Sequence, residues 1–219
     1  MLRYDRIMIS AEGDGMFITD NVYLVESSKG SYVYALRLTD GVTLIDTSFP
    51  GCGGRIAEEL QANQLGQVKR ILLTHHDVDH IGSAALLQQK YQCDVYISET
   101  DMPYVQGIKK REGIKKIISS LARVAPPERL QTLPAGNILN IRIIPTPGHT
   151  PGHTCFLFED VLFAGDLLNS RNGVLKKSPP LMTWDKQQAI DSVKAMNSVK
   201  FVWVCPAHGK PVKTSRIEI

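Results

Sequence analysis

A dense group of metal-binding residue types marks the first half of the chain. Between Thr74 and Gly82 the sequence holds three histidines and two aspartates, directly after an apolar run and before an alanine- and leucine-rich segment. Imidazole nitrogen and carboxylate oxygen are the usual protein ligands of zinc and of non-haem iron. The pattern therefore predicts a strand, a turn that carries metal ligands, and a helix. A polar loop with solvated histidines is the alternative.

Three further places repeat the pattern of a candidate ligand behind an apolar run. They are His149 and His153 after Ile141–Ile144, Asp166 after Val161–Phe163, and His208 after Phe201–Val204. Runs of β-branched and aromatic residues of this length predict strands. Because four strand ends can deliver side chains to one rim of a sheet sandwich, we expect these residues to meet.

The rest of the sequence predicts an α/β protein. Strand-like runs and glycine-containing turns predict an antiparallel meander over residues 7–46, with strands at 16–25, 31–38 and 42–45. Apolar residues at helical spacing predict helices over about 54–64, 84–91 and 185–196, and residues 169–180 predict a polar loop. Strands followed by a helix occur on each side of residue 135. This order favours a four-layer αββα sandwich of two mixed β-sheets with helices outside.

The order of the motifs resembles that of the metallo-β-lactamase fold superfamily. The likeness rests on the first motif, on Pro147–His153, Phe163–Asp166 and Cys205–Gly209, and on Thr19–Val25 with Thr43–Thr47, which resemble the family's opening strands. It covers nearly the whole chain and implies one domain over residues 1–219, with residues 99–134 as a lid-like helical insertion. The basic run 109–116 in that insertion could attract an acidic substrate. A solvated helix face is the more common reason for such a run.

The chain departs from the family pattern His-x-His-x-Asp-His at one position. Asp77 stands where the second histidine belongs, and His76 falls on the variable position, where it would point elsewhere. The resemblance implies a first metal ion held by His75, Asp77 and His149, a second held by Asp79, His80 and His208, and Asp166 as the bridge. It also implies that Asp46 supports the first metal histidine, with a turn or capping role as the alternative. His153 would support the ligands without binding a metal ion, or would be structural.

The resemblance implies two divalent metal ions as cofactors. Zinc is the first expectation, and iron or manganese is the alternative because a carboxylate at position 77 makes the ligand set harder. Two divalent cations carry four positive charges, against three negative charges on Asp77, Asp79 and Asp166. A first metal that is more electron-rich should be a weaker Lewis acid than one held by histidines alone.

The resemblance implies a metal-dependent hydrolase, more similar to the glyoxalase-II and lactonase branches than to true β-lactamases. A bridging hydroxide in the dinuclear site would cleave a small ester, thioester or lactone, with Asp79 and Asp166 as catalytic residues. The alternatives are a diiron redox or oxygen-handling domain, which Asp77 favours, β-lactam hydrolysis as a side activity, and a binding module that keeps the metal for structure. Because eleven residues follow His208, we expect no glutathione-binding helices of the glyoxalase-II kind.

The composition favours a small-molecule enzyme over a nucleic-acid or membrane protein. The formal net charge is +3, and no apolar run approaches the ~20 residues of a membrane span. We therefore expect a cytoplasmic protein with a small-molecule substrate and with neither nucleic acid nor membrane as partner. Met182 and Trp184 would form a substrate wall or a homodimer contact, although a Trp in a loop is as often a packing anchor. The four cysteines lack C-x-x-C spacing and should be core residues, with Cys205 as the one that could line the site.

Overall fold

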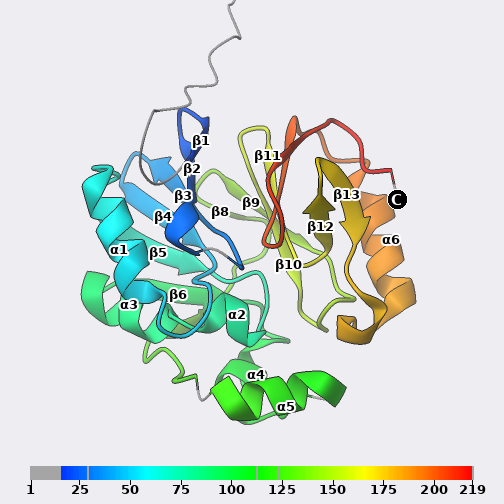
Figure 1. The fold of residues 1–219 in the computed structure, drawn as a ribbon, viewed down its shortest axis with the longest axis horizontal. Helices are drawn as coiled ribbons and strands as arrows, with labels where there is room; N and C mark the ends of the chain where they lie inside the picture. Colours follow the sequence, from blue (N-terminus) through cyan, green and yellow to red (C-terminus); the bar gives the residue numbers. More distant parts are fainter. Residues whose placement is uncertain (1–15, 29, 112, 123, 219) are drawn as a thin grey trace, which may run out of the picture.

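The computed structural model describes residues 16–28, 30–111, 113–122 and 124–218. Two β-sheets lie face to face and helices cover the outer face of each, which confirms the predicted αββα sandwich (Figure 1). The part of the expected meander at residues 7–15 lies outside the described residues. Within the described part of the chain, no helix has both the length and the apolar character that crossing a lipid bilayer requires.

The first sheet has seven strands in chain order. They are β1 (Met16–Thr19), β2 (Val22–Val25), β3 (Val33–Leu38), β4 (Gly41–Ile45), β5 (Val68–Leu72), β6 (Asp94–Ile97) and β7 (Leu130–Thr132). β1 to β4 pair antiparallel, as the predicted meander requires, whereas β4 to β7 are parallel to one another. Parallel neighbours need crossover connections. The helices α1 (Gly53–Ala62) and α3 (Ala84–Tyr91) lie in two of these crossovers and pack on the outer face of the sheet.

The second sheet has six strands in the order β15-β14-β11-β10-β9-β8. They are β8 (Asn137–Ile138), β9 (Ile141–Pro145), β10 (Thr154–Phe158), β11 (Val161–Gly165), β14 (Trp203–Pro206) and β15 (Val212–Lys213). β11 and β14 are parallel, and α6 (Lys186–Met196) connects them and packs Val193 and Met196 against the outer face. Asp185 caps this helix, because its Oδ1 accepts a hydrogen bond from the backbone N–H of Gln188 at 2.9 Å.

Both sheets bury side chains on both faces. At the end of β5, Ile71 and Leu73 face the helices, whereas Leu72 between them faces the other sheet. Phe156 and Phe163 of the second sheet fill the same central layer. Cys205 also lies in this layer, and all four cysteines are buried and free of disulfides, so the core interpretation of the cysteines holds.

The structure differs from the predicted elements in three places. The strand expected at 16–25 is a hairpin, with β1 and β2 on either side of Asp20 and Asn21. The segment 99–134 holds α4 (Met102–Val105) and α5 (Gly113–Ala122) but ends in β7, so its helical part is shorter than expected. The loop expected at 169–180 contains a hairpin of β12 (Leu168–Arg171) and β13 (Val174–Lys177). Asn172 and Gly173 form its turn with φ of 54° and 76°, a conformation that the Asn-Gly pair favours.

The strand ends bring the candidate ligands to one rim of the sandwich. Asp46 follows β4 and the first motif follows β5, while Asp166 follows β11 and His208 follows β14. Each of these two pairs of strands is parallel, so their carboxyl ends meet at the same edge. Hydrogen bonds join the two sheets at this rim, from Thr154 N–H to Thr74 O at 2.9 Å and from Tyr34 Oη to Pro206 O at 2.7 Å.

Gly82, which follows the short helix α2 (Val78–Ile81), leaves no room for a side chain. A Cβ at this position would lie 2.3 Å from the backbone nitrogen of Pro50 and 2.5 Å from the carbonyl carbon of Phe49. We expect Gly82→Ala to destabilise the protein by about 1–3 kcal/mol, because the loop after β4 must shift. Thermal unfolding would show this as a lower midpoint.

Gly54→Ala on α1 is the matched control for this prediction. Nothing lies within 4 Å of a Cβ added at Gly54. Alanine on a helix should therefore be neutral or stabilising by up to about 1 kcal/mol. An unchanged midpoint for Gly82→Ala would show that the two loops do not pack as closely as described.

Candidate metal centre

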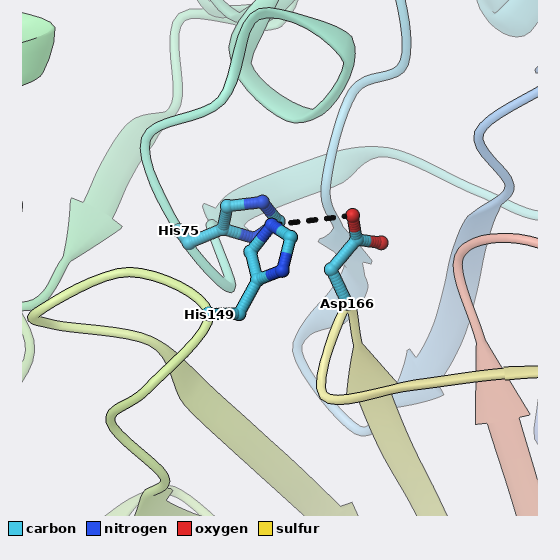
Figure 2. Close-up of side chains that lie close together, drawn as sticks. All are labelled: His75, His149 and Asp166. Atoms are coloured by element: carbon cyan, nitrogen blue, oxygen red, sulfur yellow. Dashed lines mark ion pairs between the residues drawn. The ribbon is translucent and has the colours of Figure 1, made fainter. Parts of the chain in front are cut away.

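The seven predicted ligands come together at the rim where strands of both sheets end. His75 and Asp77 lie in the turn after β5, Asp79 and His80 in α2, His149 in the turn after β9, Asp166 after β11 and His208 after β14. Figure 2 shows the side chains of His75, His149 and Asp166 pointing toward one another from three separate segments. Positions far apart in the sequence therefore face one small volume.

His75, His149 and Asp166 form the first group of candidate ligands. One ligand atom of each lies within 4.8 Å of those of the others. Asp77 adjoins this group, since its Oδ2 is 3.4 Å from His75 Nε2 and 3.1 Å from His149 Nε2. Atoms that bind one zinc ion tetrahedrally at ~2.0 Å lie about 3.3 Å apart. These separations suit ligands that share an ion.

Asp79, His80 and His208 form the second group, again with one ligand atom of each within 4.8 Å of the others. Oδ2 of Asp79 is 3.2 Å from His208 Nε2 and 3.7 Å from His80 Nε2. Asp166 reaches both groups. Its Oδ1 lies 3.4 Å from His80 Nε2 and 3.3 Å from His208 Nε2, while its Oδ2 lies 3.4 Å from His149 Nε2.

Several buried atoms of this cluster have no hydrogen-bond partner in the described protein. They are Nε2 of His75, Nε2 of His80, Oδ1 of Asp77 and Oδ1 of Asp166, together with Nδ1 of His149, which lies on the opposite side of its ring from Asp77 and Asp166. An unpaired buried polar atom costs about 1–3 kcal/mol. Metal ions placed between the two groups would use the lone pairs of the first four atoms, so the residues fit a pair of metal ions.

In three of the histidines, Nδ1, on the opposite side of the ring from Nε2, makes a hydrogen bond within the protein. His80 Nδ1 donates to Asp46 Oδ2 at 2.8 Å, and His208 Nδ1 donates to the carbonyl oxygen of Gly30 at 2.7 Å. The Thr74 hydroxyl donates to Asp46 Oδ2 at 2.7 Å, so it can accept from His75 Nδ1 at 3.0 Å. With Nδ1 protonated in each ring, Nε2 can offer its lone pair to a metal.

Asp46 supports a different histidine from the one that the resemblance implies. Its carboxylate contacts His80 directly, and it reaches His75 only through the Thr74 hydroxyl. The expectation that Asp46 supports the first metal histidine is therefore corrected to His80 of the second group. The backbone N–H of Thr74 also donates to Asp46 Oδ1 at 2.8 Å, which ties the ends of β4 and β5 together.

His76 and His153 belong to neither of the two ligand groups. Nδ1 of His76 lies 2.9 Å from Asp101 Oδ2, and its ring stacks on Tyr104 with centroids 4.3 Å apart. His153 Nδ1 lies 2.9 Å from Thr146 Oγ1, and His153 Nε2 accepts from the backbone N–H of Asp166 at 3.2 Å. Burial lowers the pKa of His153 to about 3, which keeps this ring neutral. These contacts give His153 a structural role at the turn that carries Asp166.

The charges of the cluster shift the titration of its members. Burial lowers the pKa of His208, but Asp166 and Asp79 outweigh it and raise this pKa to about 10. Burial likewise opposes the charged form of His80, and Asp46, Asp79 and Asp166 together hold its pKa well above the usual value. Burial raises the pKa of Asp77, whereas His149, His75 and Lys115 outweigh it and hold this pKa well below the usual range.

Two basic residues of the insertion, Arg111 and Lys115, enter the site. Lys115 Nζ lies 2.5 Å from Asp77 Oδ2, and Arg111 Nη2 donates to the carbonyl oxygen of His76. Their neighbours Lys110 and Lys116 are exposed. The interpretation of the basic run as a solvated face therefore holds for only part of it. Sequence reasoning missed these two site residues because the charge run does not reveal where the helix begins or which side faces inward.

Comparisons with known proteins identify the family of this chain. A family model described as Metallo-beta-lactamase superfamily matches residues 28–208. The probable polyketide biosynthesis zinc-dependent hydrolase BaeB of Bacillus velezensis is 38% identical over 62% of this chain and 53% of its own length. A hydroxyacylglutathione hydrolase of Shewanella halifaxensis is 31% identical over 64% of this chain and 47% of its own length. The chain thus spans about half the length of these two relatives.

A solved structure with the same architecture holds iron. TTHA1623 in a di-iron-bound form is 25% identical, with a TM-score of 0.68 over 84% of this chain and 89% of that chain. A carboxylate- and histidine-rich cluster of this kind suits both zinc and iron.

Asp46→Asn tests the support of His80. The amide that replaces the carboxylate has one NH₂ group, which must face either Thr74 or His80. Both of these residues donate hydrogen bonds to Asp46 and cannot do so to an NH₂ group. We expect metal affinity to fall about 10–100-fold, the usual effect of losing a group that orients a metal-bound histidine. Competition with a chromophoric chelator would measure the affinity. Asp40→Asn, which breaks the surface ion pair with Arg70, is the control and should leave the affinity unchanged.

Metal uptake should release protons from the second group. His208 with a pKa of about 10 and His80 with a raised pKa both carry protons at pH 7 in the metal-free protein. Metal binding needs their neutral rings, so ~2 protons should leave when this group is filled. Because protons compete with the metal ion for these two rings, metal binding should weaken as the pH falls. Calorimetric titration in buffers with different ionisation enthalpies would count the protons, and a release of none would contradict the charges described.

Proposed function

From the premise that this chain belongs to the metallo-beta-lactamase superfamily and is a metallo-hydrolase, we propose that it uses two metal ions to hydrolyse a small ester, thioester or lactone. The observation that carries the proposal is the set of unpaired buried ring nitrogens and carboxylate oxygens in two groups, with Asp166 facing both. The proposed ligands are His75, Asp77 and His149 for one ion, and Asp79, His80 and His208 for the other. Asp166 is the proposed bridge.

The chemistry of hydrolysis divides between the ions and the protein. When bound, two divalent cations supply Lewis acidity, which polarises a substrate carbonyl and acidifies a water molecule. Asp79 and Asp166 converge on one point, since one oxygen of each lies within 3.3 Å of His208 Nε2. Carboxylates placed in this way can orient the attacking water by accepting its hydrogen bonds. Asp79 would then take a proton from that water and pass it to the departing oxygen or sulfur.

Two cavities beside the cluster give space for a small substrate. One of about 240 Å³ is lined by His149, Lys115, Arg111, Tyr104, Met182 and Trp184. The other, of about 210 Å³, is lined by Asp77, Asp79, Phe49 and Ile118 among others. Aromatic and apolar walls with a few polar groups are typical of small-molecule sites. This supports the substrate-wall interpretation of Met182 and Trp184. The cation of Arg111 in this lining favours a substrate that carries an acidic group.

Zinc is the proposed metal, and the relative named a zinc-dependent hydrolase supports it. A diiron site is the second candidate, because Asp77 adds a hard ligand and TTHA1623 is similar in its di-iron-bound form. Elemental analysis of the purified protein distinguishes the two. A colourless zinc protein with hydrolytic activity supports hydrolysis, whereas a coloured iron protein without it favours a redox function.

The hydrolase proposal is tested with a panel of p-nitrophenyl esters, acyl thioesters and lactones, assayed with zinc-loaded and iron-loaded protein. We expect turnover of at least one class, and a loss in kcat of about 10²–10⁴-fold in Asp79→Asn, the usual contribution of a proton-transfer group. The control is Asp191→Asn on the exposed face of α6, which should retain full activity. Fully metallated protein that hydrolyses no member of the panel would refute the proposal.

A further inference from the structure

The ammonium group of Lys115 lies inside the first ligand group. Its Nζ is 2.5 Å from Asp77 Oδ2, 3.1 Å from His149 Nε2 and 3.3 Å from the carbonyl oxygen of His149. The side chain is only 12% exposed. Lysine is seldom buried to this extent unless its charge is paired. Asp77 supplies that charge at the position where the family pattern has a histidine.

We propose that Lys115 is a built-in competitor for the first metal position. Its ammonium neutralises Asp77 and takes up lone pairs of Asp77 Oδ2 and His149 Nε2, so that the second position fills first. A metal ion enters between His75, Asp77 and His149 only when Lys115 withdraws with α5. This inference rests on the proposed metal centre and concerns the regulation of its occupancy.

The competition follows from the atoms that the two cations share. His149 Nε2 has a single lone pair, and the same nitrogen faces both Lys115 Nζ and Asp77 Oδ2. A metal ion held by His149 needs that lone pair. The Asp77 Oδ2 that contacts Lys115 also faces His75 Nε2. The Lys115 ammonium and a metal ion therefore cannot both bind His149 Nε2 and Asp77 Oδ2 at the same time.

The charges of the whole cluster point the same way. Asp77, Asp79 and Asp166 carry three negative charges, which one divalent cation and the Lys115 ammonium balance. A second divalent cation added while Lys115 stays in place would leave the buried cluster with an excess of two positive charges. Uncompensated charge in such surroundings is strongly unfavourable. Loading the first position is therefore coupled to the departure of Lys115.

The helix that carries Lys115 is held by little apolar burial. On α5, Ile117 is 63% exposed and Leu121 is 80% exposed. The helix packs mainly on α2 and on the 3₁₀ turn η2 (Pro180–Met182), and Figure 1 shows it at the edge of the molecule, apart from both sheets. Segments with few buried apolar contacts open at low cost in free energy. Withdrawal of α5 is therefore compatible with an intact fold.

Zinc titration of the metal-free protein, with a competing chelator, tests the proposal. We expect wild type to bind one zinc ion tightly and a second about tenfold or more weakly, because the open state of α5 is a minor one. Lys115→Met should raise the affinity for the second equivalent about tenfold or more and leave the first unchanged. Lys115→Arg keeps the charge and should retain the weak second site. The control Lys116→Met, at an exposed position, should titrate like wild type.

Hydrogen exchange gives a readout independent of affinity. In wild type, amides of residues 113–122 should exchange faster after the second equivalent binds than after the first. Two equally tight zinc ions in both wild type and Lys115→Met would overturn the inference and leave the dinuclear hydrolase intact. Folded protein that binds no zinc or iron would overturn the proposed function as well. Circular dichroism establishes that each variant is folded before titration.

Discussion

The structure depends on crowding electron-rich atoms into a volume largely closed to water. Three carboxylates and four imidazoles bring oxygen and nitrogen atoms to separations of 3.1–3.7 Å. Such an arrangement is unfavourable unless cations or protons lie between the atoms. The ammonium of Lys115 takes that place in the first group, and the raised pKa values of His80 and His208 favour protons on these rings in the second. Metal loading therefore exchanges one set of positive charges for another.

The fold holds these atoms in place through contacts centred on Thr74. The Thr74 hydroxyl and backbone N–H both donate to Asp46, and the Thr74 carbonyl accepts from Thr154 of the second sheet. Asp46 adopts φ of 61°, a conformation that costs a non-glycine residue about 1–3 kcal/mol. The hydrogen bonds offset this strain. Gly165 lets β11 approach, because a Cβ there would lie 2.8 Å from Thr74 Cβ.

The layers and the ligand cluster could be predicted from sequence, whereas the insertion could not. Apolar runs that end at a histidine or an aspartate identify strand ends, and burial on both sides requires helices outside two sheets. The position of Lys115 depends on where α5 begins, and no cap or apolar period in residues 109–116 indicates this. The β12–β13 hairpin was missed although Asn172-Gly173 signals it, because its strands are polar and lack the expected alternation. The partner of Asp46 was misassigned because α2 turns His80 back toward β4.

The carboxylate of Asp77 and the ammonium of Lys115 in the basic insertion neutralise each other. A histidine at position 77 would remove the negative charge that Lys115 contacts, and the buried ammonium would then have only two uncharged acceptors, Nε2 and the carbonyl oxygen of His149. An aspartate without Lys115 would leave a buried carboxylate that only a metal ion or a proton could neutralise. Each residue therefore makes the other tolerable in the metal-free state. The residue at position 77 and the residue that α5 directs inward must be considered together when the metal preference of this centre is judged.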